Sequence, residues 1–128
     1  MKILLVEPGK EPVLKEIDGS LKSMQEIVGG TIQALYPFEE SVALICNDEG
    51  KLLGLPLNRA LRDENGQIYD IVAGTFFLCG APTDSDHLES IPKALVETYQ
   101  RRFTISERFL NLNEKLLCIF ITDNSSLL

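Results

Sequence analysis

The sequence contains little of what most catalytic and metal sites require. There is a single histidine, His87, and the three cysteines, Cys46, Cys79 and Cys118, lie far apart in the chain. No Cys-x-x-Cys pair is present, so we expect neither a structural zinc site nor a bound cofactor. Each cysteine lies in or beside an apolar run, which is typical of a buried, protonated thiol rather than of a nucleophile. The sequence therefore predicts no catalytic residue.

Positive charge is scarce as well. The chain has 12 Lys and Arg against 19 Asp and Glu, which gives a net charge of −7 and argues against a basic surface for nucleic acid. Acidity of this kind usually serves solubility, whereas a protein that mimics DNA phosphates needs dense rows of carboxylates. The carboxylates here come singly or in pairs, as at Glu39-Glu40 and Asp63-Glu64.

Long apolar runs are missing too. None approaches the roughly 20 residues that a membrane-spanning helix needs, and Lys2 is followed by only four apolar residues before Glu7, which is too short for a signal peptide. We therefore expect a reduced, cytoplasmic protein with no membrane contact. With 128 residues, 45% of them apolar, the chain can bury the core of one domain.

Strands are predicted where short segments are rich in apolar residues: 2–7, 13–17, 31–35, 42–46, 51–53, 71–79 and 116–121. The 13–17 segment is expected to be an edge strand paired with 2–7. The turn from Asn47 to Gly50 should join 42–46 to 51–53 as a hairpin. The most apolar run, 71–79, is expected to be the central strand, with Gly74 marking a bulge or a close backbone approach.

Helices are predicted in two places. Ser20 can cap a helix over residues 20–28, and Gly29-Gly30 ends it. A second helix should begin near Ser90, with an apolar stripe formed by Ile91, Leu95, Tyr99 and Phe103. Single helical turns are predicted around 57–61 and 107–113.

These elements indicate an α+β fold: one domain with a mostly antiparallel sheet and two main helices packed on one face. Residues 1–103 should form this domain, and residues 104–128 a C-terminal extension packed on the same domain or on a partner chain. Because an exposed strand at 116–121 would be prone to aggregation, it should be paired, and a homodimer through this strand is possible.

The best candidate for a binding site is a polar set in the middle of the chain: Asn47, Asp48, Asn58 and Arg59. Asn58 and Arg59 lie between apolar neighbours that would hold them rigidly, and an arginine there can clamp a carboxylate or phosphate with two parallel hydrogen bonds. In the structural alternative, Asn58 caps a helical turn and Arg59 pairs with Asp48 or Asp70.

Several segments resemble a known family: Val28-Gly-Gly30, Tyr36-Pro-Phe38, Cys46-Asn-Asp-Glu-Gly-Lys-Leu52, Gly54-Leu-Pro-Leu-Asn-Arg-Ala60 and Tyr69-Asp-Ile-Val-Ala-Gly-Thr-Phe76. Over residues 1–103 the chain is similar to the uncharacterised family catalogued as domain of unknown function 3846. That family occurs in gut Firmicutes, their phages and conjugative elements. The resemblance implies an accessory protein of mobile DNA. It transfers no catalytic residue, because the family has no established activity.

Three hypotheses follow. The first is a non-enzymatic accessory or interaction protein of a phage or mobile element, acting on a protein partner that the sequence does not identify. The second is a site for a small anion, binding or enzymatic, around Asn58 and Arg59. The third is an anti-restriction protein that mimics DNA.

Overall fold

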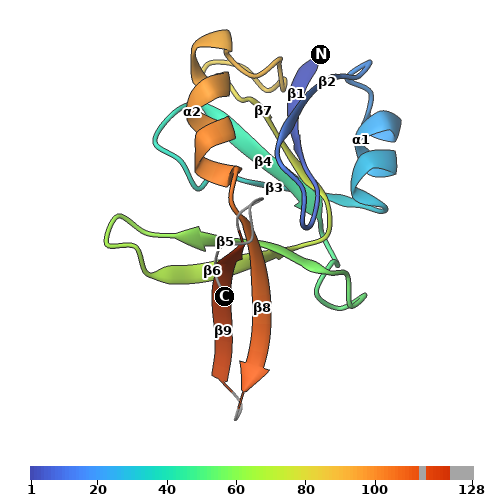
Figure 1. Ribbon diagram of the computed structural model, residues 1–128. Helices are drawn as coiled ribbons and strands as arrows, with labels where there is room; N and C mark the ends of the chain where they lie inside the picture. The colour runs from blue at the N-terminus through green and yellow to red at the C-terminus, as the bar shows by residue number, and fades with distance from the viewer. Residues whose placement is uncertain (113–114, 122–128) are drawn as a thin grey trace.

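A five-stranded antiparallel sheet lies at the centre of the molecule (Figure 1). The computed structural model describes residues 1–112 and 115–121, and the side chains of 1–107 and 109. The strands of the sheet, in the order β2-β1-β7-β4-β3, are β2 (Val13–Glu16), β1 (Lys2–Val6), β7 (Phe76–Gly80), β4 (Val42–Asn47) and β3 (Ile32–Leu35). The prediction of an edge strand paired with the first strand is confirmed in β2.

Two separate hairpins accompany this sheet. One consists of β5 (Leu57–Arg62) and β6 (Ile68–Ala73), and the other of β8 (Ser106–Leu112) and β9 (Lys115–Ile121). In Figure 1 the β5–β6 hairpin crosses beside the central sheet, and the β8–β9 hairpin extends away from it. The mostly antiparallel α+β fold is thereby confirmed.

The two predicted helical turns are wrong, because residues 57–62 and 106–112 are the strands β5 and β8. The apolar spacing within 57–61 also fits a strand whose register shifts between Leu57 and Arg59. The strand predicted at 51–53 is wrong as well, because this segment forms successive turns, with Leu53 N–H donating to Glu49 O.

Helix α1 (Leu21–Val28) and helix α2 (Lys93–Phe103) cover opposite faces of the central sheet, so the prediction that both pack on one face is wrong (Figure 1). Successive residues of a strand face opposite sides, and here both sides are apolar. In β7, Phe77 and Cys79 pack towards α1, and Phe76 and Leu78 pack towards α2.

The helix ends follow the sequence at α1 but not at α2. Ser20 caps α1 by accepting from Ser23 N–H at 3.1 Å, and Gly29 ends it in the left-handed conformation, both as predicted. Helix α2 begins at Lys93 without a side-chain cap. Ser90, the predicted cap, instead accepts a hydrogen bond at Oγ from the backbone N–H of Lys2, so it ties the segment before α2 to β1.

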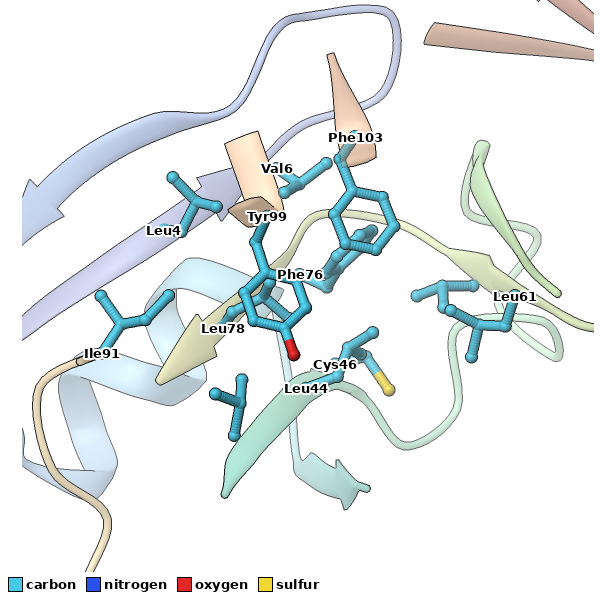
Figure 2. Close-up of a cluster of buried hydrophobic side chains, with 12 residues drawn as sticks. Leu4, Val6, Leu44, Cys46, Leu61, Phe76, Leu78, Ile91, Tyr99 and Phe103 are labelled. Atoms are coloured by element: carbon cyan, nitrogen blue, oxygen red, sulfur yellow. The ribbon is translucent and has the colours of Figure 1, made fainter. Parts of the chain in front are cut away.

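The larger of the two core clusters lies between the central sheet and α2 (Figure 2). Tyr99 and Phe103 of α2 point into it, and Phe76 meets the Phe103 ring edge-on at a centroid distance of 5.6 Å. The predicted apolar stripe of the second helix is confirmed in these two residues and in Leu95, which is half-buried against the same cluster. Ile91 is buried in this cluster too, but it precedes the helix. Leu61 of β5 and Val72 of β6 belong to the same cluster, which joins the β5–β6 hairpin to the sheet.

The run predicted as one central strand is divided at Gly74. Residues before it belong to β6, and β7 begins at Phe76 and takes the central place in the sheet. Gly74 has φ +84°, and a Cβ atom there would lie 2.8 Å from Leu55 Cδ1. The predicted close approach is therefore confirmed, and it marks where the chain leaves the hairpin and enters the sheet.

The segment predicted at 116–121 is strand β9, which pairs with β8 of the same chain. The base of this hairpin contacts β5. A homodimer through 116–121 stays a prediction. Among the described residues, no helix has the length and apolar character needed to cross a membrane.

Candidate functional site

Arg59 lies in the interior of the protein with only 1% of its surface exposed. Every N–H group of its guanidinium has an acceptor within the chain. Nε and Nη2 donate to Phe103 O at 3.3 and 2.9 Å, and Nη2 also donates to Lys10 O at 2.7 Å. Nη1 donates to the backbone and side-chain oxygens of Asn58 at 3.2 and 2.8 Å.

Asn58 completes this network. Its side-chain amide donates to Val6 O and to Gly74 O, both at 2.9 Å, and its Oδ1 accepts from Arg59. The pair therefore links β5 to the end of β1, to the glycine between β6 and β7, and to the end of α2. Because buried polar groups destabilise a fold unless they are hydrogen-bonded, the Asn58–Arg59 pair reads as an internal connector of the fold.

The charge of Arg59 is balanced chiefly by carbonyl dipoles. Burial lowers the pKa of the guanidinium, and the nearby carboxylate of Glu107 acts in the opposite direction. The expected pairing of Arg59 with Asp48 or Asp70 is wrong, and Asn58 caps no helix because β5 is a strand. No N–H group of Arg59 is left to hold an anion.

Asn47 and Asp48 lie elsewhere, at the end of β4. Asn47 Nδ2 donates to Val28 O at 3.1 Å, and its Oδ1 accepts from the backbone N–H of Glu49 at 2.7 Å. Asp48 is exposed. Both line a small cavity of about 120 Å³ together with Lys51 and Asp70, whose charged atoms are 2.5 Å apart. The predicted site residues thus divide between two places, since neither Asn58 nor Arg59 lines this cavity.

A larger hollow lies where residues 37–40, the end of α2, the β5–β6 hairpin and the start of β8 meet. It consists of two adjoining cavities, of about 240 and 440 Å³, that share the lining residues Pro37, Phe38, Arg62, Tyr69 and Arg102. We call it the junction groove, because residues of the 1–103 domain line it together with Ile105 and Glu107 from the extension.

One end of the junction groove is apolar. Phe38 packs against Tyr99 with ring centroids 4.6 Å apart. Leu61 and Phe103 line the same end, together with Ile105, which is partly exposed to solvent. Tyr69 is 56% exposed.

Both arginines of the groove are engaged within the chain. Arg62 Nη2 is 2.6 Å from Glu107 Oε1, and the Arg102 guanidinium lies over the Phe38 ring at 5.0 Å from its centroid. Glu107 is itself buried and also accepts the backbone N–H of Ala60 at 2.7 Å. The groove therefore has a fixed wall, because the two contacts of Glu107 tie the extension to β5.

The other end of the groove is acidic: its lining includes Glu39, Glu40, Asp63 and Glu64. Glu40 accepts a hydrogen bond from Tyr99 Oη, and Asp63 Oδ1 accepts two backbone N–H groups of the β5–β6 turn. In the sequence these carboxylates form two separate pairs. Residues 39–40 and 63–64 come together through the fold, and no spacing in the sequence signals it.

The described cysteines have the character expected from their apolar flanks. Burial raises the pKa of the Cys46 thiol to about 11, with the charge of Asp70 adding to the effect, and burial raises the pKa of Cys79 to about 12. His87 lies in the exposed connection between β7 and α2. Within the described part of the chain, no three potential metal ligands come together.

Comparisons with known proteins give one match. A family model described as "Domain of unknown function (DUF3846)" matches residues 1–104. No curated protein and no solved structure matches the chain.

Proposed function

The chain belongs to the DUF3846 family over residues 1–104, and on this premise we propose that it is a non-enzymatic accessory protein of a phage or mobile element that binds a protein partner in the cytoplasm. The observation that carries this proposal is the junction groove. We propose that it receives a segment of the partner that combines an apolar side chain with lysine or arginine.

The apolar end of the groove supports an anchor of this kind. Exposed aromatic rings supply large contact areas at protein interfaces, and Tyr69 is such a ring. Phe38 is held by its contacts with the Tyr99 ring and with the Arg102 guanidinium. A rigid apolar end loses little conformational entropy when a partner side chain packs against it.

The charges of the groove support a basic segment. Its positive groups, Arg62 and Arg102, already interact with Glu107 and with the Phe38 ring. The carboxylates of Glu39 and Glu64 lie at the acidic end, in a molecule with a net charge of −7. Complementary charge accelerates association and selects the partner.

The contacts of Arg59 do not favour the alternative of an anion site at Asn58 and Arg59. Its guanidinium donates to carbonyl oxygens from three parts of the chain, and a bound anion would have to displace them. We therefore place the proposed function at the junction groove.

The test compares two double variants with the wild type. Tyr69→Ser with Glu64→Lys changes the apolar and the acidic part of the groove. Leu52→Ser with Glu16→Lys makes the same kinds of change at exposed positions that do not line it. Each protein is used for cross-linked affinity purification from a lysate of the bacterium that encodes it, with quantitative mass spectrometry. Captured partners are then made as fragments and titrated at two salt concentrations.

We expect a stoichiometric partner that is retained by the control variant, reduced at least about tenfold with the groove variant, and bound more weakly at high salt. Equal capture by all three proteins would overturn the assignment to the groove. Absence of any stoichiometric partner would overturn the proposal of an interaction protein.

A further inference from the structure

The two edges of the central sheet differ in their chemistry. Edge strand β2 contains the charged residues Lys15 and Glu16, and charged side chains keep an edge from pairing with other chains. At the opposite edge, β3 and its flanks carry no charged residue from Thr31 to Phe38. An uncharged edge strand of this kind is a template for a further strand.

The backbone of β3 presents free hydrogen-bonding groups at this edge. Asp48 N–H donates to Thr31 O at 2.9 Å, which makes these two residues a hydrogen-bonded pair. The register with β4 therefore directs the backbone N–H and C=O groups of Thr31, Gln33 and Leu35 towards β4. Those of Ile32 and Ala34 face outwards. In the described part of the chain, they have no hydrogen-bond partner in the backbone.

We propose that a second copy of this chain pairs its own β3 antiparallel with this edge, about a two-fold axis through Ala34. In this register, Ala34 exchanges both backbone hydrogen bonds with the partner's Ala34, and Ile32 lies opposite the partner's Tyr36. The central sheets of the two copies then form one continuous sheet. This proposal does not depend on the proposed function of the junction groove.

The side chains of this segment suit pairing with themselves. Ala34, the residue at the axis, is small and exposed, so two copies can approach without a clash. Tyr36 is 66% exposed and Ile32 is half-buried against the α1 face, so each tyrosine ring would cover the isoleucine opposite. An aromatic opposite a β-branched residue is a favourable cross-strand pair. Because each copy is acidic, the uncharged edge is also where two copies meet with the least repulsion.

The first test is the mass of the wild-type protein in solution, measured by sedimentation equilibrium over a range of concentrations. We expect a dimer. In Ala34→Glu, two like charges face each other across the axis, which should raise the dimer dissociation constant at least about tenfold. The control, Val13→Glu, places the same charge at an exposed position of edge strand β2 and should leave the dimer unchanged. Circular dichroism shows whether each variant is folded.

A second measurement uses cross-linking and does not require loss of the dimer. In Ala34→Cys, the two Cα atoms facing each other in a hydrogen-bonded pair are about 5.5 Å apart, which suits a disulfide. Mild oxidation should therefore link two chains, whereas Lys15→Cys on β2 should not. A monomeric wild type, or a dimer that tolerates Ala34→Glu and resists cross-linking at Ala34→Cys, would overturn the proposal.

Discussion

Arg59 is only 1% exposed, and apart from Asn58 the other large side chains that are buried to this extent are aliphatic or aromatic. Removing a buried charge from water destabilises the fold unless each of its donors is satisfied. Here the acceptors are backbone carbonyls from the turn after β1, from β5 and from the end of α2. Arg59 thus determines how three distant segments meet.

Replacing Arg59 with methionine should lower the free energy of unfolding by about 2–4 kcal/mol, because the carbonyl groups of Lys10 and Phe103 lose their donor. Urea unfolding measures this loss. Arg101→Met is the matched control, and its effect should stay below about 0.5 kcal/mol, since Arg101 is exposed. A wild-type melting temperature that rises with inorganic phosphate and no longer does so in Arg59→Met would contradict the structural role.

The sequence indicated that Asn58 and Arg59 are held rigidly, but not by what. The acceptors of Arg59 are main-chain atoms far along the chain, and backbone carbonyls have no sequence signature. The backbone N–H of Lys2, which donates to Ser90 Oγ, has no sequence signature either. The sequence therefore predicts Ser90 as a helix cap. Local rules predicted the Ser20 cap correctly, because there donor and acceptor are three residues apart.

Among the elements, β7 determines the arrangement of the others. Its alternating residues supply both faces of the core, and its last residue, Gly80, lies against the connection that leads to α2. Gly80 exchanges backbone hydrogen bonds with Glu89 at 2.8 Å. This contact positions the segment before α2 across the end of the sheet.

Gly80→Ala should destabilise the protein by about 1–3 kcal/mol, because the added Cβ would lie 2.5 Å from the backbone oxygen of Ser90. Thermal or urea unfolding checks this value. The control is Thr83→Ala, at an exposed position of the connection between β7 and α2. If the two variants unfold alike, the contact at Gly80 does not limit the packing of the connection.

Element types were predictable where the period of apolar residues was clear, as in β1, β4 and α1. Residues 57–61 were assigned to a helical turn because a short apolar run fits both periods. That both helices pack on one face was expected from the usual half-buried antiparallel sheet. The nearly continuous apolar sequence of β4 and β7 belongs instead to strands covered on both sides.

On the scale of the whole molecule, Glu107 links the C-terminal extension, to which it belongs, to the family domain. Its buried carboxylate binds Ala60 N–H on one side and Arg62 on the other. The junction groove depends on this contact, because Glu107 and Arg62 form part of its wall. Neither the groove nor this contact was predictable, since each combines residues from segments that no local pattern relates.

Glu107→Ala should lower the free energy of unfolding by about 1–3 kcal/mol, since it leaves a buried backbone N–H without its acceptor. Hydrogen exchange should also become faster at the Ala60 amide. Glu97→Ala, which removes an exposed carboxylate 3.7 Å from Arg101, is the control for both measurements. Unchanged exchange at Ala60 would show that the carboxylate does not anchor the extension.

The strand order of the central sheet also governs when the protein can fold during synthesis. β1 pairs with β7, so that Leu4 lies beside Leu78, and most of the family domain must be translated between them. At typical elongation rates of about 5–20 residues per second, this interval is on the order of ten seconds. During that time β1 can pair only with β2, its neighbour in sequence, and its other edge stays without a partner strand until β7 arrives.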